Sequence, residues 1–216
     1  LVLTANSNES AEEFEEIVNM LLGKKVDGII SVTPPGGAET MAHIVDLGIP
    51  LVQVDRLCGG LEADYVGVGN YGSTYDMISG MIKDSYCKIA MVSLDLDVNP
   101  IHERCSAYRD AMAANGFKDK ILEAFIRYGE EEESDVVRAS ELVAGADVDA
   151  VFFTSRRAFT LTMDEIARKG YGHIEGKCMS CFDDVRSYLA SSLEIRCVGQ
   201  PIREMACKAF SLLLDK

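Results

Sequence analysis

The stretch that decides the fold of this protein is VDGIISVTPPGGAETMAHIVDLGIPLVQVDR, residues 26–56. Residues 26–32 form an apolar run typical of a buried β-strand, and the Pro-Pro-Gly-Gly turn at 34–37 ends it. Residues 38–47 have helical spacing and stop at a glycine, and residues 50–54 form a second apolar strand. A strand, a helix and a second strand at this spacing predict a βαβ unit, in which a helix joins two parallel strands.

The same alternation continues on both sides of this stretch. A short apolar run at residues 1–5 precedes a helix that Ser10 caps, with Glu13 as its capping-box partner and Gly23 as its end. Further strands are predicted at 65–68, 88–93, 121–128, 150–154, 177–182 and 194–198, about nine strands in all. Further helices are predicted at 73–83, 102–115, 132–144, 158–169, 184–191 and 202–214. The fold class is therefore α/β, with parallel sheets flanked by helices; periodicity leaves open one wide sheet or two lobes.

Composition excludes several classes of protein. The 216 residues carry 21 Lys and Arg against 35 Asp and Glu, a net charge of −14, which argues against nucleic-acid binding through this segment. A content of 48% hydrophobic and 26% charged residues is that of an ordinary globular chain. No apolar run approaches the ~20 residues of a membrane span, so we expect no membrane partner.

The seven cysteines are odd in number and scattered through apolar runs. Secreted frameworks pair their cysteines, whereas scattered buried thiols suit a reducing cytosol, so we expect a cytoplasmic protein. Cys178 and Cys181 match the CxxC pattern of redox and zinc sites. Residues three apart on a strand point to opposite faces, so two packing cysteines are the favoured interpretation.

Other chemical motifs are absent or weak. There is no phosphate-binding loop and no nucleophile elbow, and the glycines at 67–72 have the wrong spacing for a dinucleotide site. The three histidines are far apart in sequence, and the acidic run at 130–135 is explained by the start of a helix. We therefore expect no catalytic residues, no metal and no cofactor, and the protein is predicted not to be an enzyme.

Polar side chains follow several of the predicted strands. In open parallel sheets, ligands bind outside the carboxyl ends of the strands. The residues at these ends, with an arginine at the start of a helix and an aromatic face, are Asp55, Arg56, Arg104, Phe153, Ser155, Asp183 and Gln200. Carboxylate, carboxamide and guanidinium groups together satisfy sugar hydroxyls, which both donate and accept, so a saccharide is the predicted ligand. The alternative is structural: an Asp55–Arg56 pair and helix caps at Asp183 or Asp184.

Seven short segments stand in the order of a known family: VDGII at 26–30, GIPLV with DR at 48–56, VGVGN at 66–70, ER with Tyr108 and AM at 103–112, Gly116, FDD at 182–184, and QP with EM at 200–205. With these, essentially the whole chain resembles the effector-binding core of LacI/GalR-type transcriptional regulators. That fold is shared with periplasmic sugar-binding proteins.

The resemblance implies two interleaved Rossmann-like lobes of the type I periplasmic-binding-protein kind, with the ligand in the cleft between them. The first lobe would comprise residues 1–84 plus 200–216, and the second residues 85–199, including a crossover strand. Five residues match sugar-contacting positions of the family, and Ser155 stands where the family often has a ligand-binding Asn; the five are Asp55, Arg56, Arg104, Asp183 and Gln200.

Departures from the family pattern bear on the ligand. The usual Asp-Asn pair is Gly69-Asn70 here, and the usual Asn-Asp after a second-lobe strand is Ser155-Arg156. A Gly-His pair is replaced by Ser85-Tyr86, and a frequent aromatic by Glu131. These changes leave room for an acidic or modified saccharide near Arg156.

The leading hypothesis is a ligand-sensing domain of a cytoplasmic transcriptional regulator that binds a saccharide effector and forms a homodimer. DNA would be bound only through a headpiece that is absent from these residues, and the family's first strand and helix would precede Leu1, with a final strand after Lys216. The first alternative is a periplasmic sugar-binding protein of an ABC transporter or chemoreceptor. An enzyme on the same scaffold is the third class.

Overall fold

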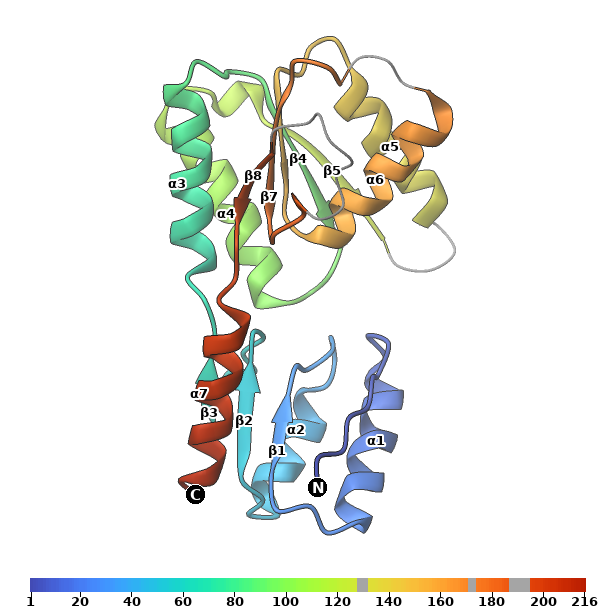
Figure 1. The fold of residues 1–216 in the computed structure, drawn as a ribbon, viewed down its shortest axis with the longest axis vertical. Helices are drawn as coiled ribbons and strands as arrows, with labels where there is room; N and C mark the ends of the chain where they lie inside the picture. Colours follow the sequence, from blue (N-terminus) through green and yellow to red (C-terminus); the bar gives the residue numbers. More distant parts are fainter. Residues whose placement is uncertain (128–131, 171–173, 187–194) are drawn as a thin grey trace. The chain divides into compact units, whose positions relative to one another are not determined.

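The computed structural model describes residues 1–127, 132–170, 174–186 and 195–216 (Figure 1). These residues fall into two compact units. Unit 1 comprises Leu1–Val68, Asp97–Pro100 and Pro201–Lys216, and unit 2 comprises Gly69–Leu96 and Ile101–Gln200.

Unit 1 is built on a three-stranded parallel sheet in the order β1-β2-β3. Its strands are β1 (Ile29–Ser31), β2 (Leu51–Val54) and β3 (Asp64–Val66). Helix α2 (Ala38–Asp46) joins β1 to β2, so the predicted βαβ unit is present (Figure 1).

Helices cover both faces of this sheet. Helices α1 (Ala11–Gly23) and α2 bury Phe14, Met41 and Ile44 against Leu51 on one face. Helix α7 (Ile202–Leu214) packs Met205 and Ala209 on the other face. Both faces of β2 are therefore buried, which explains why its sequence is an apolar run rather than an alternating one.

Unit 2 contains a five-stranded parallel sheet in the order β5-β4-β6-β7-β8. The strands are β4 (Ile89–Leu94), β5 (Leu122–Ile126), β6 (Ala150–Phe153), β7 (Cys178–Phe182) and β8 (Ile195–Val198). The helices of this part of the chain are α3 (Asn70–Lys83), α4 (Asn99–Ala114), α5 (Glu132–Ala144) and α6 (Arg156–Lys169), with a short 3₁₀ turn at Lys118–Lys120.

Helices α5 and α6 pack on one face of this sheet, over a core that includes Val92, Val151 and Phe153. On the opposite face, Ser180 of β7 contacts Met81 of α3, and Tyr108 of α4 bonds to the backbone of β4 and β5. The central strands β4 and β6 are buried along their whole length, as their apolar sequences require.

Most predicted elements are present, with shifted ends. Residues 1–7 form neither helix nor strand, and the described residues contain eight strands. The strand predicted at 26–32 is limited to Ile29–Ser31, the three residues that pair with β2, because a strand extends only as far as its ladder. Helices α3 and α6 begin earlier than predicted, and the helix predicted at 184–191 lies largely outside the described residues.

The capping box predicted at the start of α1 is only half present. Ser10 Oγ accepts from the Glu13 N–H at 3.2 Å, as predicted. The Glu13 carboxylate instead accepts from Asn8 Nδ2 at 2.9 Å. The cap is therefore a single hydrogen bond at Ser10.

The two units and the predicted lobes differ in the place of helix α3, of the segment Asp97–Pro100 and of Gln200. The predicted boundary lay after Asp84, whereas α3 belongs to unit 2, which begins at Gly69. The division into residues 1–84 plus 200–216 and 85–199 stays a prediction about the lobes.

Candidate functional site

The parallel strands of unit 2 bring three of the predicted site residues to one edge of the sheet. Strands β6, β7 and β8 end next to one another, and their carboxyl ends lead into Ser155, Asp183 and Gln200. Parallel pairing therefore gathers residues that are far apart in the sequence.

Asp183 is the most constrained residue at this edge. Its backbone has a φ of 103°, a value that residues other than glycine rarely adopt. Its carboxylate accepts from Gln200 Nε2 at 2.7 Å and from the Arg156 N–H at 3.1 Å, and its own N–H donates to Val198 O at 2.9 Å. Contacts with three residues, Arg156, Val198 and Gln200, hold a strained backbone here, which is characteristic of functional sites.

Arg104 is buried, with 4% of its surface exposed. Its Nε and one terminal nitrogen donate to Asn70 Oδ1 at 2.9 and 2.7 Å, and the other terminal nitrogen donates to Thr154 O at 2.9 Å. The guanidinium also lies 3.6 Å above the ring of Phe182. These contacts fix the direction of the guanidinium, so the cation is pre-oriented.

Three neighbouring residues of β6 and α6 have different surroundings. Ser155 caps α6, since its Oγ accepts from the Ala158 N–H at 3.3 Å. Arg156 is exposed at the first position of the helix. Phe153 is fully buried and packs edge-to-face on Phe159 at 5.2 Å, so its ring belongs to the core.

Unit 1 holds the other two predicted residues. Asp55 follows β2 with a φ of 62°, and its carbonyl accepts from the Tyr65 hydroxyl at 2.9 Å. Arg56 forms a forked ion pair with Glu9 at 2.5 and 2.7 Å and donates to Thr33 O at 3.1 Å. A strained aspartate thus follows a strand in both units, and Arg56 has a carboxylate partner that the sequence did not indicate.

The structure therefore brings Arg104, Ser155, Asp183 and Gln200 to one edge of unit 2. Three residues that contact Arg104 were not predicted as site residues: Asn70, Thr154 and Phe182. The Phe182 face is covered by Arg104, so this ring orients a cation. A buried asparagine at a helix start has no distinctive sequence pattern.

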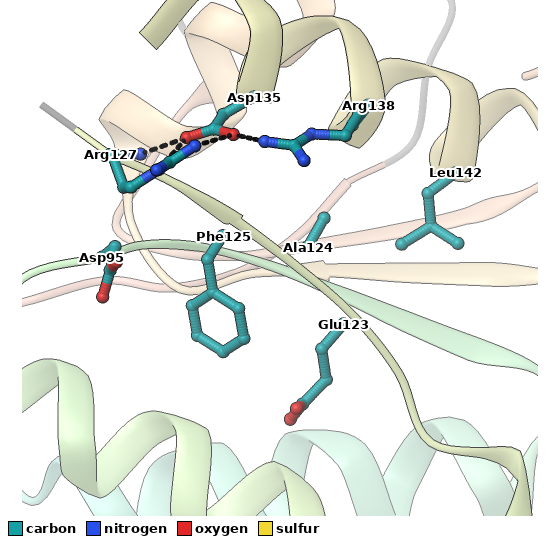
Figure 2. Close-up of a pocket in the computed structure, with 8 residues that line it drawn as sticks. All are labelled: Asp95, Glu123, Ala124, Phe125, Arg127, Asp135, Arg138 and Leu142. Atoms are coloured by element: carbon teal, nitrogen blue, oxygen red, sulfur yellow. Dashed lines mark hydrogen bonds and ion pairs between the residues drawn. The ribbon is translucent and has the colours of Figure 1, made fainter. Parts of the chain in front are cut away.

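A separate hollow of about 480 Å³ lies beside the edge strand β5 and contains none of the predicted residues (Figure 2). Figure 2 shows Arg127 and Arg138 both directed at the carboxylate of Asp135. This carboxylate is buried and accepts from the backbone and side chain of Arg127 and from Arg138. The cluster ties the end of β5 to the first turn of α5, which is a structural role.

The cysteines of the CxxC pattern are buried in β7. Cys181 faces α5 and α6 in the core, whereas Cys178 lies beside Tyr86. Burial raises the pKa of both thiols, which keeps them protonated near neutral pH. Across residues 1–127, 132–170, 174–186 and 195–216, no three His, Cys, Asp or Glu side chains form a metal-binding group.

None of the helices in the described part of the chain combines the length and apolar character needed to cross a bilayer.

The chain has two α/β units, each built on a sheet of parallel strands, with polar residues at the carboxyl ends of the strands. This arrangement is typical of a class of ligand-binding proteins. The chain belongs to the family described as "Periplasmic binding protein domain", which matches residues 1–213. The predicted resemblance to LacI-type regulators and the predicted fold class are both confirmed by the relatives.

Among curated proteins, the chain is 24% identical over 218 residues to the HTH-type transcriptional regulator PtxS of Pseudomonas plecoglossicida, a match covering 100% of this chain and 62% of PtxS. The chain thus spans less than two thirds of the curated relatives it matches.

Two solved structures show the same fold. The transcription regulator CcpA of Lactococcus lactis has a TM-score of 0.78 at 19% identity, over 98% of this chain and 77% of CcpA. A LacI family transcriptional regulator from Lactobacillus casei, solved with bound glucose, has a TM-score of 0.76 at 19% identity, over 100% of this chain and 81% of that one.

Proposed function

We propose that this chain is the ligand-sensing part of a LacI-type transcriptional regulator and that its effector is a small saccharide. The observation that carries the proposal is the group at the edge of unit 2, where a strained Asp183 follows β7 and Arg104 of α4 is pre-oriented by bonds to Asn70 and to Thr154 at the end of β6. The carboxylate and Gln200 accept from sugar hydroxyls, and the guanidinium donates to sugar oxygens.

Four further residues join this proposed site with different roles. Asp55 and Arg56 would contact the effector from unit 1, and Ser155 would do so from the start of α6. Phe153 would act through its position in the core beneath these residues, because its ring is buried.

The remaining parts of the proposal concern the whole protein. The effector would act through its different affinities for two lobe arrangements. The regulator would be a cytoplasmic homodimer without catalytic activity, and a separate headpiece would bind DNA. Seven free cysteines and the regulator names among the relatives favour this over a periplasmic transport protein.

A thermal-shift screen with sugars, sugar acids, sugar phosphates and nucleosides tests this function. A true effector at a hundredfold excess over its Kd stabilises the protein by about 2.7 kcal/mol, which is a readily measured shift in Tm. The shift should be lost in Asp183→Asn and Arg104→Lys. It should persist in the control Asp147→Asn, whose carboxylate is 93% exposed and pairs only at the surface with Lys88. A panel without any stabilising compound would overturn the proposal.

A further inference from the structure

Strands β7 and β8 place two cysteines side by side. The parallel register pairs Cys181 of β7 directly with Cys197 of β8. Both side chains lie on the same face of the sheet, because Cys181 belongs to the core beneath α5 and α6 and Cys197 packs against that core. Burial, and to a smaller extent Asp183 and Cys197, raise the pKa of Cys181, so the two sulfurs are close enough to interact.

The spacing of these two strands suits a disulfide. Neighbouring strands lie about 4.7–4.9 Å apart, and disulfides join Cα atoms that are about 4.4–6.8 Å apart. The Cβ atoms of a disulfide are about 3.8 Å apart, so β8 has to approach β7 by about 1 Å. Among the described residues, β8 is the last strand of the sheet and is hydrogen-bonded to β7 alone, so no second strand resists this movement.

The two thiols differ in their access to solvent. Cys181 is fully buried, its Sγ donates to Phe182 O at 3.3 Å, and its raised pKa keeps it protonated near neutral pH. Cys197 is only half-buried and lies on the edge strand. A dissolved oxidant therefore meets Cys197 first, and Cys181 is placed to react second.

We propose that Cys181 and Cys197 form an oxidation site at which a hydroperoxide produces a disulfide between β7 and β8. The Cys197 sulfur attacks one oxygen of hydrogen peroxide and the O–O bond breaks, which leaves a sulfenic acid and, with the thiol proton, one water. The Cys181 sulfur then attacks the sulfenic sulfur, and its proton leaves with the hydroxyl group as a second water. The two thiols lose two electrons and two protons in total, and one peroxide is reduced to two waters.

The cross-link lies directly before the strand ends that carry two residues of the proposed ligand site. Cys181 is followed two residues later by Asp183, and Cys197 three residues later by Gln200. Gln200 Nε2 donates to Asp183 Oδ1 at 2.7 Å, and the Asp183 N–H donates to Val198 O at 2.9 Å. The disulfide therefore restrains this pair. Any effect on effector binding rests on the proposed function, whereas the oxidation itself does not.

Peptide mapping of the full chain after treatment with hydrogen peroxide tests the proposal. Free thiols are alkylated in denaturant, and trypsin then releases residues 178–186 and 197–203 as separate peptides. After oxidation the two peptides should be joined, with a mass two hydrogen atoms below their sum, and dithiothreitol should separate them again. The exposed Cys207 lies in a third peptide, residues 204–208, and its oxidation shows that the peroxide dose was sufficient.

Cys178→Ala is the matched control. Cys178 lies in the same strand and the same peptide as Cys181 but beside Tyr86 on the opposite face, so the cross-link should persist in this variant. Cys197→Ala replaces a half-buried residue of the edge strand and should abolish the cross-link. Cys181→Ala should also abolish it and should leave a sulfenic acid at Cys197 that dimedone traps.

Hydrogen exchange of the oxidised chain tests whether the cross-link reaches the strand ends. Exchange of the Asp183 N–H should be slower by at least about tenfold, because a disulfide restricts the opened segment. Unchanged exchange would contradict the restraint on Asp183.

The proposal is overturned if Cys207 is oxidised while the two peptides stay separate, if the cross-link persists in Cys181→Ala, or if dimedone labels Cys181 in Cys197→Ala. These experiments use no ligand, so they and the saccharide screen can fail independently.

Discussion

At the scale of single residues, the contacts that matter are those that a sequence pattern does not reveal. Tyr108 is an example, because it lies in the middle of α4 and its side chain is fully buried. Its hydroxyl is placed to donate to Ile89 O at 2.8 Å or Leu122 O at 3.2 Å, and it accepts from the Leu122 N–H at 3.1 Å. One phenol thus joins α4 to two neighbouring strands of unit 2.

Replacing this tyrosine by phenylalanine should destabilise unit 2. Tyr108→Phe keeps the ring but leaves the buried Ile89 carbonyl and the Leu122 N–H without this partner, at a cost of about 1–3 kcal/mol. Urea unfolding at neutral pH measures the loss. The matched control is Tyr71→Phe, because Tyr71 is 40% exposed and bonds Asp110 at the surface. An equal loss in the two variants would contradict the explanation.

The Tyr108 hydroxyl also predicts that the protein loses stability at alkaline pH. Burial raises the pKa of Tyr108 from its ordinary value of 10 to about 12, so the folded state holds this proton more tightly than the unfolded chain does. The stabilising contribution is complete below pH 10 and is lost as the pH rises from 10 to about 12. The free energy of unfolding should therefore fall less steeply in this range for Tyr108→Phe than for wild type. Identical slopes would rule out Tyr108 as the titrating group.

At the scale of elements, the ends of helices are determined by distant residues as well as by local ones. Ser10 and Ser155 are local caps that the sequence pattern can indicate. The end of α5 is different, because the segment that follows it is held by Lys177 of a later part of the chain. Its Nζ donates to Gly145 O at 2.7 Å and to Val148 O at 2.6 Å.

Lys177→Met should loosen the end of α5. The substitution retains much of the apolar stem but removes both bonds to backbone carbonyls, and we expect a loss of about 1–3 kcal/mol in the free energy of unfolding. Hydrogen exchange should increase at residues 142–149 in particular. The comparison is Lys169→Met, since Lys169 is an exposed residue in the last turn of α6. Unchanged exchange at residues 142–149 would show that Lys177 does not hold this segment.

At the scale of the whole molecule, net charge bears on whether these residues can approach DNA. The net charge of −14 makes approach to DNA unfavourable for these 216 residues. The proposed regulator would therefore bind DNA through a part with the opposite charge.

The isolated 216-residue chain should consequently not retard DNA in a mobility-shift assay, even at low salt, where phosphate contacts are strongest. A basic protein of similar size serves as the positive control on the same fragments. Retardation by this chain that weakens as salt is added would contradict the assignment of DNA binding to another part of the protein.

The sequence by itself determined the α/β class and nearly all of the elements. Apolar runs, helical spacing and glycine or proline stops are local properties, so the βαβ unit at residues 26–56 and the ends of α5 and α7 were predictable. The lengths of the strands were less predictable, because a strand extends only as far as its pairing partner. Strand β1 is an example, since it is limited to the three residues that pair with β2. The order of the strands in each sheet likewise depends on contacts between distant segments of the chain.

Only the tertiary structure decided what the polar residues do. The sequence pointed to Asp183 and Gln200 at the ends of strands and to Arg104 at a helix start, although α4 begins earlier, at Asn99, and it could not pair these residues with one another or with Asn70. It could not show that Phe153 is buried, that Glu9 holds Arg56, or that Phe182 lies beneath a guanidinium. The physical reason is that hydrogen bonds and stacking act over a few ångströms, whereas these partners are 17 to 78 residues apart in the sequence and meet only when the chain folds.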